Sequence, residues 1–347
     1  MAHTPRIGLV SYTNLTSGIG VFAAELIRYL GIDSVLSVKN RVKGQEEWIE
    51  RQMNGDSPLT KERVNAYLDK YKPDVVLFFE TPFGSGLQWC RTRRNDFKVV
   101  AIPMQETMGA KDFSWCDALF CPCQLALDKA QRQAVKRAYG LFLPIGLEMF
   151  PYRQRTGHIF VHNVGYGWRA DRRQTKRVVE AFVKLEDPEA RLIINAQERF
   201  PEGCIAKDER IDYRLRSYEK PADIFVDGDI AILPVAYGGY ERMIPESMAS
   251  GMPTLTVDAD PMSMFQHDPD FLMRPSRSRC VTSPFFYKVI FNEVSVGALH
   301  KKMEWLLGID TAAYGQKAYR QAKAQSWESE QIDYRKVWMD TLCDVAS

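Results

Sequence analysis

The sequence predicts an α/β protein with two doubly wound domains, each built on a parallel sheet covered by helices. Apolar runs of strand length alternate with amphipathic segments of helical length, and this alternation starts again at His158 after a polar stretch. The stretch 229–258 shows the pattern best, because a strand, a glycine loop, a helix and a second strand follow one another. A length of 347 residues, 45% of them hydrophobic, suffices for two cores.

The first domain is predicted over residues 1–150. Gly18 and Gly20 follow its first strand, where a glycine loop lets backbone N–H groups approach a phosphate. Residues 18–23 also fit the dinucleotide fingerprint. However, the preceding loop is long and the next strand ends in Lys39 rather than an acidic residue, which disfavours a nicotinamide or flavin site. The expected strands are 6–12, 34–38, 75–79, 98–103 and 117–122, and the expected helices are 21–30, 45–52, 61–71 and 125–139.

The second domain is predicted over residues 151–318, and a C-terminal helix over 319–347 is expected to return to the first domain. Residues 260–286 carry no clear period and are expected to be irregular. The expected strands are 158–164, 191–196, 211–215, 230–234 and 254–257, and the expected helices are 175–185, 221–225, 295–307 and 311–343.

Charge and cysteine content exclude several classes of protein. Lys and Arg number 46 against 44 Asp and Glu, so no overall field favours nucleic acid or an anionic membrane. Seven cysteines are scattered without a C-x-x-C pair, so we expect reduced thiols and no metal site. The N-terminus runs directly into a strand, and no apolar stretch is long enough to span a bilayer. A cytoplasmic protein is expected.

The helix of the 229–258 stretch carries the most specific motif. Residues 245–253, PESMASGMP, resemble the donor-binding helix of GT-B glycosyltransferases, in particular the family-4-like retaining enzymes. The resemblance implies two Rossmann-like domains facing a cleft, and it implies that Glu246 binds the nucleotide ribose. Many members carry another Glu eight residues earlier, where this chain has Gly238. Residues 237–239 are similar to a YGG variant of divergent phage or bacterial members, so either Glu241 replaces the missing carboxylate or donor-sugar recognition differs.

Phosphate binding is expected at the start of the second domain. In the family an Arg and a Lys there bind the donor diphosphate. Arg173 falls where the Lys stands, and Arg169 lies within one residue of the Arg. Guanidinium groups bind phosphate oxygens in pairs of hydrogen bonds. Backbone N–H groups of Gly238, Gly239 and Tyr240 are further candidates for the phosphates or the sugar.

One candidate catalytic residue lies in the first domain. Family members often place a donor-contacting His in the loop after the 98–103 strand, but none of the five histidines of this chain is near it. Glu106 or Gln105 is the local candidate, and a solvated loop carboxylate is the alternative. Together with Arg169, Arg173 and Glu241, Glu106 completes the expected catalytic set.

The resemblance implies a retaining glycosyltransferase that needs no cofactor and uses a nucleotide-activated hexose, with UDP-glucose as the expected donor. A hydroxymethylated base in phage DNA is one expected acceptor, and a polysaccharide or small molecule is the alternative. A non-catalytic nucleotide-sugar-binding protein stays open as a different class of function. The arginines expected to contact DNA are Arg91, Arg93, Arg94, Arg274, Arg277 and Arg279.

Overall fold

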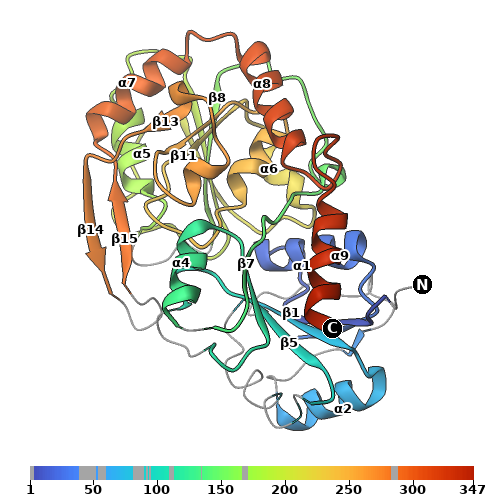
Figure 1. The fold of residues 1–347 in the computed structure, drawn as a ribbon. Coiled ribbons are helices and arrows are strands. Elements are labelled where there is room, and N and C mark those ends of the chain that lie inside the picture. Colours follow the sequence, from blue (N-terminus) through green and yellow to red (C-terminus); the bar gives the residue numbers. More distant parts are fainter. Residues whose placement is uncertain are drawn as a thin grey trace. The chain divides into compact units, whose positions relative to one another are not determined.

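A computed structural model describes residues 4–38, 52–53, 60–80, 90, 93, 95–108, 113–133, 135–165, 171–282 and 288–347. The chain divides into two compact units, coloured along the sequence in Figure 1. Met1–Pro144 and Glu330–Ser347 belong to the first unit, and Ile145–Ser283 and Lys288–Ser329 belong to the second. Each unit has its own sheet and its own buried core.

The described strands of the first unit form one parallel sheet. From edge to edge they are β3 (Gln52–Met53), β2 (Ser34–Ser37), β1 (Ile7–Ser11), β4 (Val75–Phe79), β5 (Lys98–Ile102), β6 (Ala118–Cys121) and β7 (Ala138–Gly140). Runs of Val, Leu, Ile and Phe make β1, β4 and β6, which are buried along their whole length as strands covered on both faces must be. The strand order reverses between β1 and β4, which defines a Rossmann-type sheet.

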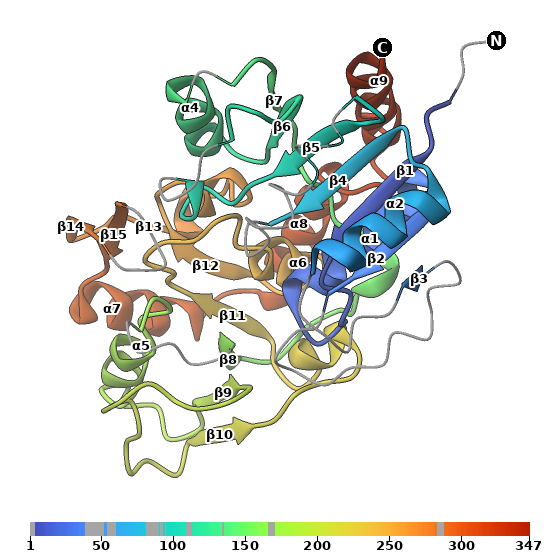
Figure 2. The ribbon, with the colours of Figure 1, turned by 90° about the horizontal axis from the view of Figure 1, so that it is seen from below.

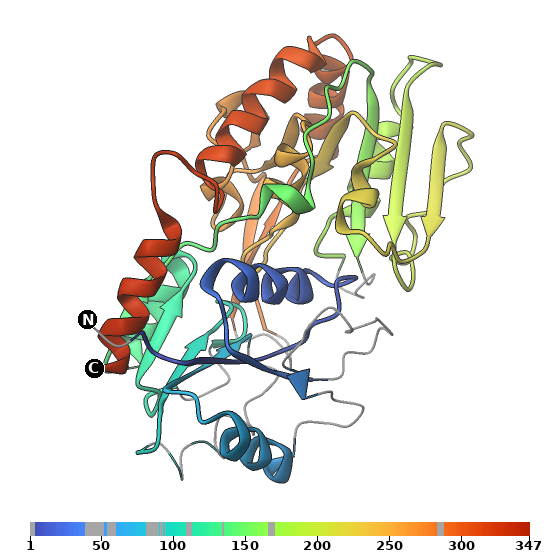
Figure 3. The same ribbon diagram turned by 90° about the vertical axis from the view of Figure 1, so that its right-hand side faces the viewer.

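Helices cover this sheet on both sides. Figure 3 shows α1 (Gly18–Leu30) and α2 (Lys61–Tyr71) on opposite faces. The C-terminal helix α9 (Tyr334–Ala346) packs against α1 and β4. Its fully buried Trp338 donates a hydrogen bond to the carbonyl oxygen of Phe142 at 2.9 Å, which ties the end of the chain to the first unit.

Two helices expected in this half differ from the structure. Helix α4 (Gln124–Arg132) ends before the predicted 125–139 segment does, because Ala138–Gly140 instead pair with β6 as the edge strand β7. Edge pairing of this kind depends on a distant strand and overrides the local helical pattern. The helix expected over 45–52 lies outside the described residues except for Gln52, which belongs to β3.

The described part of the second unit repeats the same architecture. Its parallel strands, in the row that Figure 2 shows, are β10 (Ile211–Leu215), β9 (Arg191–Ala196), β8 (Ile159–Gly165), β11 (Ile230–Leu233), β12 (Thr254–Val257) and β13 (Leu272–Met273). The order again reverses in the middle, between β8 and β11. Ligands of such sheets bind beyond the carboxyl ends of the strands at this switch point.

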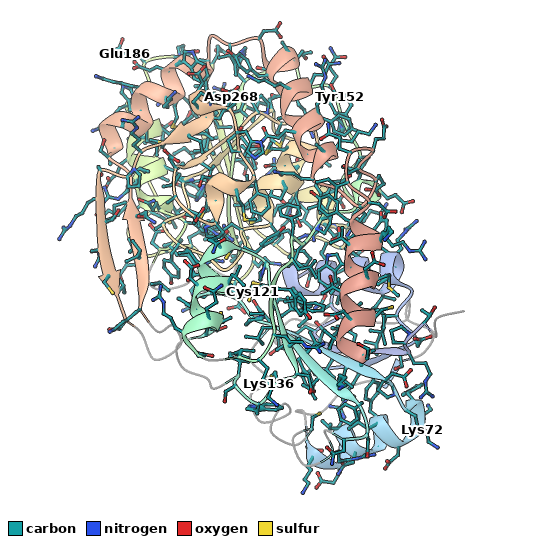
Figure 4. All side chains as sticks on the ribbon, in the orientation of Figure 1. Lys72, Cys121, Lys136, Tyr152, Glu186 and Asp268 are labelled. Carbon is teal, nitrogen blue, oxygen red and sulfur yellow. The ribbon has the colours of Figure 1, made fainter. Side chains whose placement is uncertain are left out.

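Four α-helices are described around this sheet. Helix α5 (Thr175–Phe182) packs with α7 (Val296–Leu306), and α6 (Met243–Ala249) packs with α8 (Thr311–Ala324). Figure 4 shows Tyr152 and Asp268 on either side of α8. The ring of Tyr152 packs against that of Tyr319 with centroids 4.6 Å apart, and Oδ2 of Asp268 lies 2.8 Å from Nζ of Lys317. The described short 3-10 helices are η2 (Leu147–Met149), η3 (Pro221–Phe225), η4 (Met262–Met264) and η5 (Pro269–Phe271).

Two predictions for the C-terminal third were wrong. The segment 260–286, expected to be irregular, contains β13 and also β14 (Arg277–Val281), which pairs antiparallel with β15 (Val289–Glu293). The helix expected over 311–343 is two helices, because α8 stops at Ala324 and α9 begins only after its N-cap Asp333. The interruption lets α8 stay in the second unit while α9 belongs to the first.

The described residues show neither a membrane-spanning helix nor a metal-binding group. Among the described helices, none has the length and apolar character needed to cross a membrane. In the same part of the chain, no group of three or more His, Cys, Asp or Glu side chains lies close enough to hold a metal ion.

Candidate functional site

The two loops at the switch point of the second unit lie side by side. The loop after β8 ends in residues 171–174, and the loop after β11 leads through residues 234–242 into α6. The backbone N–H of Ala236 donates to the carbonyl oxygen of Arg172 at 2.8 Å, which joins the two loops directly. This pairing brings charged side chains of both loops together.

A carboxylate from one loop binds two guanidinium groups from the other. Arg172 donates from Nη1 to Oε1 of Glu241, and Arg173 donates from Nη1 to Oε2. Arg172 also reaches the carbonyl oxygen of Tyr237 at 3.3 Å. The Glu241 side chain is only 3% exposed and that of Arg173 only 9% exposed. The three charges therefore form one cluster at the carboxyl ends of β8 and β11, in which Glu241 and Arg173 are buried and Arg172 is 25% exposed.

The pKa values of this cluster show which charges it stabilises. Burial alone would raise the pKa of Glu241, but Arg172 and Arg173 outweigh burial and hold that pKa below its usual range. Burial lowers the pKa of Arg173 to about 10, and repulsion by Arg172 adds to this effect while Glu241 opposes it. At neutral pH both guanidinium groups and the carboxylate are charged.

Arg173 keeps one donor unused. Its Nε atom is buried and, among the described residues, has no hydrogen-bond partner. A buried guanidinium N–H without an acceptor is costly, so an atom of this kind favours a bound oxygen ligand. Arg173 is therefore a sequence-predicted residue with a spare buried donor. Arg169 lies outside the described residues.

A second ion pair lies at the start of α6. Arg242 donates from Nε to Oε1 of Glu246, four residues later, and both side chains are at least nine-tenths buried. Glu246 also raises the pKa of Arg173, so the two ion pairs interact. Three guanidinium groups against two carboxylates leave a formal charge of +1 in a buried site. Because α6 begins at Met243, Glu246 lies in its first turn.

The first glycine of the YGG segment, Gly238, is crowded. A Cβ on residue 238 would lie 2.5 Å from Cγ of Glu241 and closer still to its carboxyl group. Only glycine fits there while Glu241 keeps this position. Tyr240 packs edge-to-face on Phe265 with ring centroids 4.8 Å apart and is 3% exposed, so its side chain belongs to the core. Gly239 is buried in the same loop.

Left-handed backbone is concentrated around this cluster. Six non-glycine residues of the described chain have positive φ, and Asp171, Gln174 and Glu241 are three of them. Such residues cost about 1–2 kcal/mol each and gather at functional sites. Asp171 accepts from the backbone N–H groups of Thr175 at 2.8 Å and of Lys176 at 3.0 Å. Those N–H groups at the start of α5 are thus already used.

The sequence analysis missed three residues of this site. Arg172 precedes the predicted Arg173, and Arg242 stands four residues before Glu246, a spacing that places two side chains on one helix face. His162 lies within an apolar run that suggests only a strand. It is fully buried, its pKa is lowered to about 4 by burial, and its two ring nitrogens contact Ile232 and Thr175.

The glycine loop of the first unit differs from the expectation. The N–H of Gly20 donates to the hydroxyl group of Ser17 at 3.1 Å, which caps α1, so this N–H does not face a phosphate. A Cβ on Gly20 would collide with the backbone of Asn14, which explains the glycine by close packing. Gly18 is exposed, and a Cβ there would meet nothing within 4 Å.

The other candidate of the first unit lies in the loop after β5. Lys129 of α4 donates from Nζ to the carbonyl oxygen of Gln105 at 2.6 Å and to its Oε1 at 2.9 Å. Burial lowers the pKa of Lys129, while the charge of Glu106 opposes that shift. Glu106 is thus a half-buried carboxylate beside a lysine, rather than a freely solvated one.

Two of the arginines expected to contact DNA are paired with carboxylates of the described chain. Arg93 binds Asp69 at 3.0 Å and Asp96 at 3.3 Å. Arg279 binds Glu293 at 2.9 Å and lies over the ring of Phe291. Arg274 and Arg277 are exposed, and Arg91 and Arg94 lie outside the described residues.

Comparison with known proteins identifies the fold. No model of a protein family and no curated protein matches the sequence. Sucrose-phosphate synthase from Thermosynechococcus elongatus matches with a TM-score of 0.71 at 12% identity, over 98% of this chain and 100% of that one. HepE of Anabaena in complex with UDP and glucose matches with a TM-score of 0.70 at 10% identity, over 98% of this chain and 100% of that one. The lipopolysaccharide outer core galactosyltransferase WaaB matches with a TM-score of 0.64 at 12% identity, over 98% of this chain and 99% of that one. The chain therefore has the GT-B fold.

Proposed function

We propose that this protein is a glycosyltransferase that moves a hexose from a nucleotide diphosphate sugar to a hydroxyl group. One observation carries the proposal. Arg172, Arg173 and Arg242 converge with two carboxylates at the switch point of the second unit and keep one positive charge in excess. Adjacent guanidinium groups match the charge and the oxygen geometry of a diphosphate. The spare Nε donor of Arg173 supports the same ligand.

UDP-glucose is the donor that we propose. HepE, which shares the fold, was solved in complexes with UDP-glucose and with UDP, and this supports the choice. In the proposal Glu246 accepts hydrogen bonds from the ribose hydroxyl groups. Arg173 binds the diphosphate together with Arg169, and the N–H groups of Gly238 and Gly239 bind further phosphate or sugar oxygens.

The proposed reaction retains the configuration of the sugar. The bond between the anomeric carbon and the diphosphate oxygen breaks, and its electron pair stays on the β-phosphate. The acceptor oxygen attacks the same face of the sugar, and its proton passes to the leaving phosphate. Charge grows on the diphosphate as the bond breaks, so fixed guanidinium groups stabilise the transition state more than the ground state.

The proposed acceptor is a compound that carries a free hydroxyl group. Exposed Arg274 and Arg277 favour a polyanion, such as DNA with hydroxymethylated bases, in which the base would leave the duplex to react. Polysaccharides and small molecules are the competing acceptors. Glucose transfer from UDP-glucose to each class, measured side by side, decides among them.

Thermal melting with a panel of nucleotide sugars, together with release of UDP, tests the function. A ligand that binds the folded state raises its melting temperature, so a selective shift identifies the donor. Arg173→Ala should abolish both the shift and the release. Arg191→Ala is the matched control, because Arg191 is 46% exposed and pairs only loosely with Glu189 at 3.9 Å. No shift with any nucleotide sugar would rule out the proposal, and a shift without release would favour a non-catalytic sensor.

A further inference from the structure

Glu241 reaches the arginine cluster by an unusual route. Its backbone is left-handed, with φ of 53°, and its side chain folds back over residue 238 of its own loop. The carboxyl group occupies the space that a side chain on residue 238 would fill. The absence of a side chain at Gly238 and the position of the Glu241 carboxylate therefore depend on each other.

The carboxylate in this position binds both arginines. Each of its oxygens accepts from a different guanidinium group, and the side chain is almost fully buried. Without it, Arg172 and Arg173 would be two adjacent like charges in a buried environment, which repel each other. With it, each guanidinium is held through its Nη1 atom, and the buried Nε atom of Arg173 has no hydrogen-bond partner among the described residues.

We propose that Glu241 is a positioning residue for the diphosphate site, which holds Arg172 and Arg173 side by side in a geometry that only glycine at position 238 permits. The inference rests on the proposed function and adds to it the group that sets the phosphate geometry. Glu241 acts here through the two arginines, without touching the ligand. A carboxylate with a purely structural role would affect all ligands alike. Removal of Glu241 should instead weaken the binding of phosphate groups and leave nucleoside binding unchanged.

Two variants separate position from charge. Glu241→Gln keeps the size of the side chain and removes its charge. Gly238→Ala keeps every charge, but its Cβ pushes the carboxylate away from the arginines. Gly297→Ala is the control, because a Cβ on this helical glycine meets nothing within 4 Å.

Ligand-detected NMR titrations with UDP, uridine and inorganic pyrophosphate test the inference on the full chain. We expect both variants to bind UDP and pyrophosphate about tenfold more weakly, the effect of one charge-assisted contact, while uridine binding stays unchanged. Unchanged uridine binding also shows that the site is folded. Gly297→Ala should behave as the wild type.

The outcomes distinguish the two proposals. If the wild type binds UDP and both variants keep its ratio of UDP to uridine affinity, Glu241 does not position the arginines. If the wild type binds pyrophosphate but no nucleotide, the proposed function fails, and the effect of the variants on pyrophosphate still decides the role of Glu241. If it binds neither UDP nor pyrophosphate, both proposals are wrong.

Discussion

His162 accepts a hydrogen bond from the hydroxyl group of Thr175 at 3.0 Å, and neither side chain is exposed. The carbonyl oxygen of Ile232 can only accept, so Nδ1 of the ring donates to it at 2.7 Å and Nε2 is the acceptor toward Thr175. One neutral imidazole thus joins β8, β11 and the first residue of α5. These elements lead into the loops that carry Arg173 and Glu241.

Stability should fall in mild acid because of His162. Its pKa is about 4 in the folded protein against an ordinary 6.5, so between these values the unfolded chain binds a proton that the folded chain does not. The free energy of unfolding therefore decreases as the pH falls through this window, by about 3 kcal/mol in total. Urea denaturation at about pH 7.5 and about pH 5 should show about 2 kcal/mol of this loss, and His162→Gln should reduce it. An equal loss in the variant would contradict the assignment.

Arg173→Lys should impair the proposed reaction without removing the charge. A lysine ammonium cannot bridge Glu241 and a phosphate in the way that a guanidinium fork does. We expect kcat/KM for the donor to fall about 100-fold. Steady-state release of UDP measures this, with Arg191→Lys as the control. Activity within a few-fold of the wild type would mean that charge alone is required.

Gly20→Ala should destabilise the first unit. The new Cβ meets backbone atoms of Asn14, which cannot move aside as a side chain can, so we expect a loss of about 1–3 kcal/mol. Gly18→Ala is the control, with open space around it and no expected loss. Chemical denaturation of both variants compares them, and equal stability would show that the loop shifts without cost.

Trp338→Ala should show how firmly α9 holds the first unit. The indole is fully buried, packs edge-to-face on Phe120 at 5.5 Å and donates to Phe142. Its truncation should lower the free energy of unfolding by about 3–5 kcal/mol. Val337→Ala, at a position 43% exposed on the same helix, should change little. Thermal melting distinguishes them, and a small effect of both changes would mean that α9 contributes little to stability.

Glu106→Gln should lower turnover while leaving UDP affinity unchanged. Glu106 belongs to the first unit, whereas the arginine cluster belongs to the second. If Glu106 is catalytic, as expected from the sequence, loss of its charge should reduce kcat about 100-fold. Calorimetric titration with UDP and single-turnover kinetics separate the two effects. Turnover equal to that of the wild type would leave Glu106 as a loop carboxylate held near Lys129.

Much of the fold follows from local patterns. Runs such as Val75–Phe79 and Ile230–Leu233 are so apolar that only strands covered on both faces accommodate them. The predicted strands of both units lie in the two sheets accordingly. The other strands were less predictable. Ala138–Gly140 is a strand because it pairs with β6, and Arg277–Val281 is a strand because it pairs with β15, and no local period predicts such pairing.

The candidate site was predicted in part. The resemblance to GT-B glycosyltransferases implied Arg173, Glu241 and Glu246, and the structure gathers these charged residues into interacting ion pairs. Gly20 was placed wrongly, since its N–H caps α1. The cap depends on how residues 14–17 fold back over the helix, which spacing does not reveal.

The sequence alone determined the α/β class, the repeated strand and helix alternation and the residue types available for binding a phosphate. These follow from hydrophobic periodicity and side-chain chemistry, which act over a few residues. The tertiary structure decided which charges meet. Glu241 contacts arginines that are 68 and 69 positions away in the sequence, because the parallel strands β8 and β11 end side by side. Residues this far apart in the sequence meet only through the tertiary fold.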